Sequence, residues 1–175
     1  MENSEEILDI VDNQDNVIGT LPRSAVYQKN IKNFRVINAF IINSKGELWI
    51  PRRTANKRLC PLALDVSVGG HVESGETYEK AFARELKEEL NLNINSIQYK
   101  QIGYITPYSH DITAFMKIYQ IDMDQAPSYN PNDFLEYYWL TPYNLLERLE
   151  NGDKGKSDLV KLINYFFIKK QCSKA

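Results

Sequence analysis

The stretch that decides the fold runs from Gly69 to Leu92 and reads GGHVESGETYEKAFARELKEELNL. Residues 77–90 contain no Pro or Gly and are rich in residues that favour helices, so we predict a helix there. At 3.6 residues per turn, its residues 85, 88 and 89, all glutamates, lie on one face. Three neighbouring carboxylates repel one another unless a cation binds between them, and hard divalent cations prefer carboxylate oxygens. The pattern therefore predicts a divalent metal site on this helix.

A glutamate-rich helix is more often a solvated surface that pairs with Lys or Arg, and this alternative must be weighed against the metal site. Two features favour the metal site. A Gly-rich turn at Gly69 and Gly70 comes before the helix at a fixed distance and can bring a backbone carbonyl to the same ion. Phe82, Leu86 and Leu90 form an apolar stripe rotated away from the glutamates, which gives the helix a face to bury.

The whole spacing of this stretch also resembles the Nudix box of the Nudix hydrolase superfamily. The resemblance is carried by Gly70, Glu76, the run RELKEEL at 84–90, and Leu92. This pattern is far more specific than a lone Gly-rich loop. The family usually has Gly where this chain has Asn91, and Asn is the next most tolerant residue at a left-handed helix end, so we regard the change as neutral.

The resemblance implies an α/β fold, a Nudix-type α/β/α sandwich with a mixed β-sheet flanked by helices. At 175 residues, the chain is long enough for one sizeable core, and we predict a single Nudix domain over 1–175. The net charge of −2 argues against a general nucleic-acid-binding protein. Cys60 and Cys172 form neither a metal-ligand pair nor a disulfide scaffold.

The sequence shows no signal-peptide core and no apolar run of transmembrane length, so we expect no membrane partner and a cytoplasmic location by default. The sequence does not distinguish a monomer from a homodimer.

Strand and helix patterns alternate along the rest of the chain, which supports one compact α/β domain. A nearly all-apolar run at 35–43 (RVINAFIIN) predicts a central strand that is covered on both faces. The strands predicted at 97–105 and 112–121 should pair in antiparallel fashion, which makes the sheet mixed. The other predicted strands are 7–11, 17–20, 47–50, 64–68 and 136–140, and the other predicted helices are 23–29, 142–150 and 158–169.

A basic loop follows the strand at 47–50 and carries Arg52, Arg53, Lys57 and Arg58. An exposed loop arginine is ordinary surface. The planar guanidinium group is nevertheless well suited to phosphate oxygens, and the loop precedes the metal helix. We therefore keep both interpretations of these residues, solvated loop and phosphate capture.

The order of segments over nearly the whole chain resembles the superfamily branch that contains type I isopentenyl-diphosphate isomerases and their hydrolase relatives. Matching segments include RVINAFIIN at 35–43 and EYYWLTP at 136–142. This resemblance implies that Arg53 and Lys57 contact the diphosphate of a substrate. The isomerase's catalytic Cys corresponds to Gly69 here. Without a thiol to move the proton, the isomerase reaction lacks a principal group, so we favour a hydrolase.

The Nudix resemblance implies Mg²⁺-dependent hydrolysis of a phosphoanhydride in which a diphosphate is joined to another group. Glu85, Glu88 and Glu89 would bind Mg²⁺, with Mn²⁺ as the alternative ion, and the Gly70 carbonyl would be a further ligand. The metal would deliver a water as nucleophile and neutralise charge on the leaving phosphate. Glu88 or Glu89 would act as the general base.

In some Nudix enzymes the general base lies outside the box, and the candidates here are Asp111, His110 and Glu136. A loop histidine without a catalytic role and a glutamate paired beside a strand are the ordinary interpretations of the last two. Arg84 is expected to be structural, forming an ion pair with Glu76 that holds the turn against the helix.

Two other functions remain as alternatives to a hydrolase. An isomerase is disfavoured by the missing Cys, and an inactive Nudix-fold binding module by the intact box glutamates. The partner is expected to be a small-molecule diphosphate rather than a nucleic-acid polymer. Nucleoside triphosphates, nucleotide sugars, dinucleoside polyphosphates and isoprenoid diphosphates all remain candidate substrates, because specificity lies outside the box.

Overall fold

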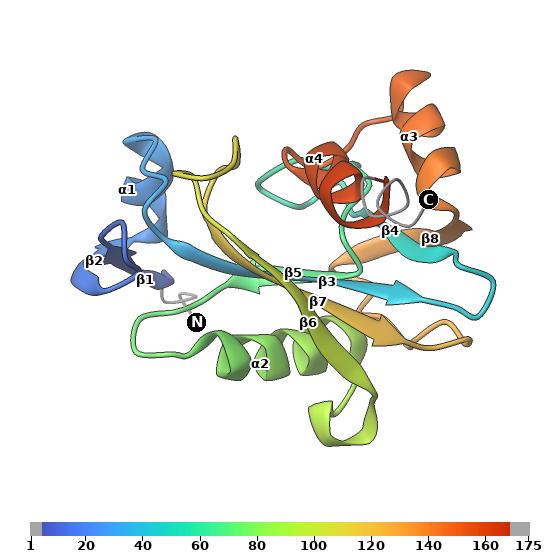
Figure 1. Ribbon diagram of the computed structural model, residues 1–175, viewed down its shortest axis with the longest axis horizontal. Helices are drawn as coiled ribbons and strands as arrows, with labels where there is room; N and C mark the ends of the chain where they lie inside the picture. Colours follow the sequence, from blue (N-terminus) through green and yellow to red (C-terminus); the bar gives the residue numbers. More distant parts are fainter. Residues whose placement is uncertain (1–4, 169–175) are drawn as a thin grey trace, which may run out of the picture.

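The computed structural model describes residues 5–168, which form a two-stranded sheet, a six-stranded sheet and flanking helices (Figure 1). The strands are β1 (Ile7–Val11), β2 (Val17–Pro22), β3 (Arg35–Ile42), β4 (Leu48–Arg53), β5 (Val68–His71), β6 (Tyr99–Ile105), β7 (Phe115–Asp122) and β8 (Phe134–Leu140). The helical elements are α1 (Arg23–Gln28), α2 (Tyr78–Leu90), the 3₁₀ turn η1 (Ile94–Ser96), α3 (Pro142–Glu150), α4 (Leu159–Ile163) and the π-helical turn η2 (Asn164–Ile168). Within residues 5–168, no helix has the length and apolar character needed to cross a membrane.

The larger sheet is mixed, as predicted. Its strand order is β6–β7–β3–β4–β8, and β5 pairs with β3. β3 and β7 run parallel over their full length, whereas the other paired strands of this sheet, including β6 and β7, are antiparallel. The central strand β3 is largely buried, as its apolar sequence predicts.

One edge of β3 changes its partner along its length. At one end, Ile42 pairs with Leu48 of β4, and in the other half Val36 to Ala39 pair with β5. The chain between β4 and β5 stays attached to β4 through a hydrogen bond from the Asp65 amide to the Pro51 carbonyl, 2.9 Å. β4 and β5 therefore diverge, and the cavity described below lies where they separate.

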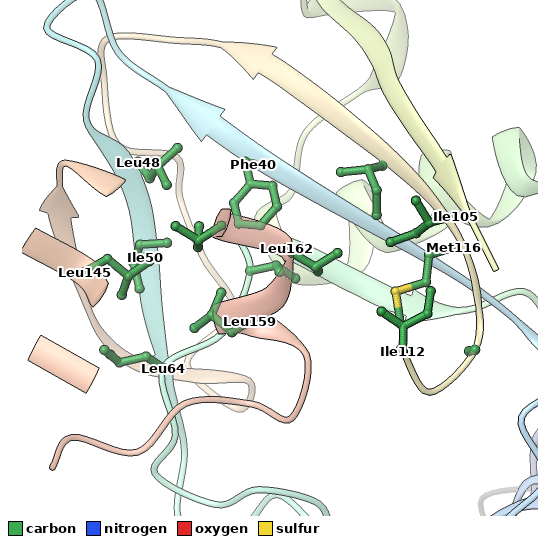
Figure 2. Packing of buried hydrophobic residues seen from close by; sticks show 14 of the residues in the cluster. Phe40, Leu48, Ile50, Leu64, Ile105, Ile112, Met116, Leu145, Leu159 and Leu162 are labelled. Carbon is green, nitrogen blue, oxygen red and sulfur yellow. The ribbon is translucent and has the colours of Figure 1, made fainter. Parts of the chain in front are cut away.

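Helices cover both faces of the larger sheet and give the predicted α/β/α sandwich (Figure 1). On one face, Phe82, Leu86 and Leu90 of α2 pack against the sheet, so the predicted apolar stripe is buried. On the other face, α3 and α4 supply the apolar residues. Figure 2 shows part of that second cluster, with Leu159 and Leu162 of α4 beside the side chains of the sheet.

The strand predicted at 64–68 is wrong, because only its last residue belongs to a strand. β5 instead begins at Val68 and includes Gly69 and Gly70, which we had predicted to form a turn. Polar side chains take the place of a regular ladder before it. The Ser67 hydroxyl donates to the Trp49 carbonyl at 2.6 Å and accepts from the Ile41 amide at 2.8 Å. These bonds satisfy buried backbone groups without strand pairing.

The helix predicted at 158–169 is only partly correct. α4 ends at Ile163 and continues as the π-helical turn η2 to residue 168, while residue 169 lies outside the described residues, as does Cys172. The turn carries consecutive aromatic residues. Phe167 packs on Phe40 with ring centroids 5.0 Å apart, and a Cβ on Gly103 would lie 2.2 Å from the Phe166 ring. Placing neighbouring aromatic rings against the sheet explains the departure from regular α-helix.

Candidate active site

A cavity of about 290 Å³ lies between β5 and α2 on one side and the loop after β4 and the segment before α4 on the other. Gly70, Glu85 and Glu89 line the first side, which we call the carboxylate wall. Basic residues line the second side, which we call the cationic wall, and these are Arg53, Lys57 and Lys156. The structure therefore brings most of the predicted site residues to a single cavity. Glu88 is the exception, since it does not line the cavity and its side chain is 58% exposed.

Local capping fixes the helix that carries the carboxylates. The Thr77 hydroxyl accepts a hydrogen bond from the Lys80 amide at 3.2 Å and caps the start of α2. Asn91 ends the helix in the left-handed conformation, with φ of 52°. Its amide donates to the Lys87 carbonyl at 3.1 Å, and the Leu92 amide donates to the Leu86 carbonyl, also at 3.1 Å. Asn91 thus takes the position usually held by Gly in this motif.

Gly70 allows β5 to approach this helix closely. A Cβ at this position would lie 1.9 Å from Glu85 Oε1, inside any permitted contact distance. The requirement is one of space, since Gly70 lies in a strand and pairs with Ile37 of β3. The absence of a side chain therefore lets a backbone segment and a carboxylate meet at the wall of the cavity.

The two carboxylates of this wall lie close together, and their side chains have little exposure to solvent. Glu89 is 7% exposed, and its Oε2 accepts a hydrogen bond from the Gly69 amide at 3.1 Å. Burial, with the nearby charge of Glu85, raises the pKa of Glu89 well above its ordinary value. Burial also raises the pKa of Glu85 to about 7, against the opposing effect of Arg84. Both groups therefore lack the positive charge that would fully stabilise their ionised forms.

Arg84 joins the turn before α2 to the helix itself. Its guanidinium forms a bidentate ion pair with Glu76, with both contacts at 3.0 Å, as the sequence predicts. It also donates to the His71 carbonyl at 2.9 Å and to Glu85 Oε1 at 2.7 Å. A weaker contact of 3.4 Å reaches Glu88. Arg84 therefore links β5 to three glutamates of the box, Glu76, Glu85 and Glu88.

The two predicted phosphate-binding residues line the opposite wall, and each has an acidic partner. Arg53 Nη1 lies 2.7 Å from Asp65 Oδ2, and its Nε donates to the Leu59 carbonyl at 3.1 Å. Lys57 forms an ion pair with Asp133. The Arg53 side chain is only 10% exposed. Its position is thus fixed by the protein before any substrate binds.

The family model described as the NUDIX domain matches residues 32–163. The chain belongs to the Nudix hydrolase family. The chain is 57% identical over 162 residues to an uncharacterised Nudix hydrolase of Nostoc. The aligned region covers 93% of this chain and 96% of that protein. It is 45% identical over 160 residues to a Nudix hydrolase of Deinococcus radiodurans, covering 91% and 93% of the two chains.

A crystal structure from Deinococcus radiodurans has the same fold. It superposes with a TM-score of 0.87 at 43% identity and covers 93% of this chain and 99% of that one. The resemblance to the isomerase branch is also confirmed, at lower identity. Isopentenyl-diphosphate Delta-isomerase 1 of Photorhabdus laumondii is 26% identical over 152 residues, covering 83% of this chain and 85% of the isomerase.

The donor atoms of this Nudix site are oxygens, the type of ligand that a hard divalent cation prefers. Glu85 and Glu89 offer buried carboxylate oxygens beside a strand whose backbone reaches them, and a cation would relieve the cost of burying their charges. The carboxylates are not gathered around one point. Among residues 5–168, no three His, Cys, Asp or Glu side chains form a group that could hold a metal ion. Arg84 instead contacts two of the three candidate metal ligands, Glu85 and Glu88.

Lys156 is a residue of the cavity that the sequence analysis missed. Its Nζ lies 3.2 Å from Asp65 Oδ1, on the cationic wall. The Lys156 amide donates to the Leu64 carbonyl at 2.9 Å, and the Leu64 amide donates to the Lys154 carbonyl at 2.7 Å. The segment NGDKGKSD at 151–158 looks like an ordinary solvated loop, so the sequence carried no signal for its position.

The N-terminal part of the chain supplies a third side of the cavity. Glu6 Oε2 lies 2.8 Å from His71 Nδ1, and His71 Nε2 lies 2.9 Å from the Tyr27 hydroxyl. The hydrogen bond from His71, together with Arg23, lowers the pKa of Glu6 to about 2. Because the Glu6 carboxylate can only accept, His71 donates from Nδ1, and in the neutral ring Nε2 accepts a hydrogen bond from the Tyr27 hydroxyl. The first strand of the chain is thereby tied to β5.

The three candidate bases outside the box do not line the cavity. Asp111 is exposed and pairs with Lys161 at 2.9 Å. His110 contacts Ser109 at 2.8 Å. Glu136 forms an ion pair with Arg52 at 2.7 Å, on the β4–β8 pair. The structure therefore assigns these residues contacts away from the carboxylate wall.

Proposed function

We propose that this Nudix hydrolase cleaves a phosphoanhydride bond in a small molecule in which a diphosphate is joined to another group, with Mg²⁺ or Mn²⁺ as cofactor. One observation carries the proposal: the buried Glu89 and the largely buried Glu85 face basic residues across a single cavity. Phosphate oxygens fit the cationic wall, and a divalent cation fits the carboxylate wall.

Glu85, Glu88, Glu89 and the Gly70 carbonyl are the groups we propose to hold the metal. When bound, the ion would supply a water of lowered pKa and neutralise charge on the phosphates. Arg84 orients Glu85 through its 2.7 Å contact, and the Gly69 amide orients Glu89.

The remaining protein groups handle the proton and the phosphates. A carboxylate oxygen of Glu88 or Glu89 is proposed to take the proton of the attacking water as the new P–O bond forms and the anhydride P–O bond breaks. Arg53 and Lys57 are proposed to bind the phosphate oxygens. Because Asp65 fixes the guanidinium of Arg53, binding there requires little ordering of the side chain.

The isomerase alternative fits the structure less well. A Cβ on Gly69 would lie 2.8 Å from Val66 Cγ2 and 3.0 Å from Asn38 Oδ1. These contacts leave no free space for a thiol at the position where the isomerases carry one. An inactive binding module is disfavoured by the intact box glutamates.

A panel of diphosphates tests the proposal. The wild-type protein is assayed with nucleoside triphosphates, nucleotide sugars, dinucleoside polyphosphates and isoprenoid diphosphates, with and without Mg²⁺, beside Glu88→Gln. Glu79→Gln is the matched control, because Glu79 is exposed on the same helix and pairs with Lys117 at 2.7 Å. We expect Mg²⁺-dependent hydrolysis that Glu88→Gln reduces by about 100-fold or more and the control leaves unchanged. The mechanism is wrong if no compound is hydrolysed with Mg²⁺, or if Glu88→Gln is as active as wild type.

A further inference from the structure

We propose that Lys156 binds a phosphate group of the substrate and positions the diphosphate across the cavity from the carboxylate wall. This inference rests on the proposed function, because it names a substrate contact for the same site. Lys156 lies outside the Nudix box and comes from the segment between α3 and α4.

Backbone hydrogen bonds hold the segment around Lys156 in place, so the Lys156 side chain begins from a defined position. The segment runs beside Leu64 as a short parallel bridge at Gly155, with hydrogen bonds on both sides of the bridge, 2.7 and 2.9 Å long. From there the Lys156 side chain lines the cavity. A Cβ on Gly69 would lie 3.4 Å from Lys156 Nζ, so the ammonium stands over the residue whose amide holds Glu89. Lys156 therefore bridges from the cationic wall toward the carboxylates.

Among the three basic residues of the cationic wall, Lys156 has the longest ion pair, 3.2 Å, and it shares that carboxylate with Arg53. Asp65 is buried and is the only carboxylate within ion-pair distance of Arg53 or Lys156 in the described residues, through Oδ2 and Oδ1 respectively. The single negative charge of Asp65 is thus shared by the positive charges of Arg53 and Lys156. The other basic residue of this wall, Lys57, has Asp133 as its own partner. A dianionic phosphate would balance the excess charge.

Lys156 is also more able to reach a ligand than Arg53. The Arg53 side chain is 10% exposed and its donors contact Asp65 and the Leu59 carbonyl, whereas the Lys156 side chain is 33% exposed. A lysine ammonium carries three donors on a flexible stem and acts as a compact charge. Within residues 5–168 its ammonium has one ion pair, at 3.2 Å, which leaves donors available for phosphate oxygens. Lys156 therefore adds a direct contact to those proposed for Arg53 and Lys57.

Kinetics of three variants test this assignment. Lys156→Met removes the charge and keeps the stem, Lys156→Arg restores a charge, and Lys154→Met is the matched control two residues away. The ammonium interacts with phosphate equally in the ground state and the transition state, so KM should rise about tenfold in Lys156→Met while kcat changes less than about threefold. Lys156→Arg should recover most of the loss, and Lys154→Met should behave as wild type.

Binding of inorganic diphosphate in the presence of Mg²⁺ gives a readout that does not depend on turnover. We expect Lys156→Met to weaken this binding about tenfold in calorimetry and Lys154→Met to leave it unchanged. If the wild type binds diphosphate in this way but hydrolyses nothing, the proposed function fails and the assignment of Lys156 stands. If Lys156→Met and Lys154→Met have the same KM and the same affinity, the assignment is overturned. A loss of thermal stability with unchanged KM would show a purely structural role and would also overturn it.

Discussion

The two walls of the cavity are built in opposite ways. The carboxylate wall comes from one continuous stretch, in which β5, a turn and α2 follow one another. Its charges are alike and buried without full compensation. The cationic wall is assembled from two segments that are distant in sequence, the end of β4 with the loop after it and the segment before α4, and its basic residues are held by Asp65 and Asp133. The carboxylate wall thus has negative charge that a cation could compensate, whereas the basic residues of the cationic wall already form ion pairs with aspartates of the protein.

The largest effect should follow from removing the charge of Glu89, the more buried of the two glutamates on the carboxylate wall. Glu89→Gln should reduce kcat about 1000-fold, because a candidate metal ligand and base is lost. It should also raise the thermal midpoint of the metal-free protein, since a buried, poorly compensated charge is replaced by a neutral group of similar shape. The measurements are a steady-state assay and thermal unfolding with and without Mg²⁺. Unchanged activity would remove Glu89 from the site, and Glu79→Gln is the control.

Removing a carboxylate from beside the cationic wall should lower the stability of the protein, in contrast to Glu89→Gln. Asp65→Asn leaves the buried Arg53 guanidinium without its carboxylate, and we expect a loss of about 3 kcal/mol in the free energy of unfolding. Urea unfolding measures this loss. Asp124→Asn is the control, since Asp124 is exposed and accepts a hydrogen bond from Ser44 that Asn can also accept. Equal stability of the two variants would mean that Asp65 does not hold this wall together.

A smaller effect should come from adding one methyl group to the carboxylate wall. In Gly70→Ala the new Cβ displaces the Glu85 carboxylate, so the Mg²⁺ concentration for half-maximal activity should rise about tenfold. Gly19→Ala is the matched control, because nothing lies within 4 Å of a Cβ at that strand position. If both variants need the same Mg²⁺ concentration, the close contact between Gly70 and Glu85 has no part in metal binding.

The smallest effect concerns a clamp behind the cationic wall and depends on pH. Asp153 accepts two hydrogen bonds of 2.8 Å from Arg52 and one of 2.7 Å from Arg148, and these bonds lower the pKa of Asp153. A lowered folded-state pKa stabilises the protein above the unfolded-state value of about 3.9, and this stabilisation is lost as the pH falls below it.

Wild type should therefore be more stable than Asp153→Asn by about 1 kcal/mol at pH 7, and the difference should shrink progressively below about pH 4. Urea midpoints of the two proteins between pH 7 and pH 3 measure the difference. A difference that does not change with pH would mean that the charge of Asp153 is not what holds the clamp.

The sequence was most informative where neighbouring residues act together. The Nudix box predicted α2, the pairing of Arg84 with Glu76, and the left-handed position of Asn91, because all of these depend on contacts within a short stretch. The mixed sheet and its central strand also followed from local patterns. Glu88 shows the limit of this reasoning, since helical spacing placed it with Glu85 and Glu89 but could not show that it is exposed.

Features that depend on distant segments were missed. Val68 to His71 form a strand because β3 accepts them as a partner where β4 diverges, and no pattern within residues 64–71 signals that. Lys156 is placed by backbone pairing with Leu64, across a separation of more than 90 residues that a polar loop sequence does not reveal. The π-helical turn likewise depends on the surface that receives Phe166 and Phe167.

The late position of Lys156 in the sequence also sets the order in which the two walls of the cavity are synthesised. α2 leaves the ribosome with its glutamates well before β7, which pairs with the central strand, and before Lys156. At roughly 5–20 residues per second, several seconds separate the end of α2 from the arrival of Lys156. A growing chain would therefore carry the carboxylate wall before it has either a complete sheet or Lys156, the residue that we propose to bind phosphate.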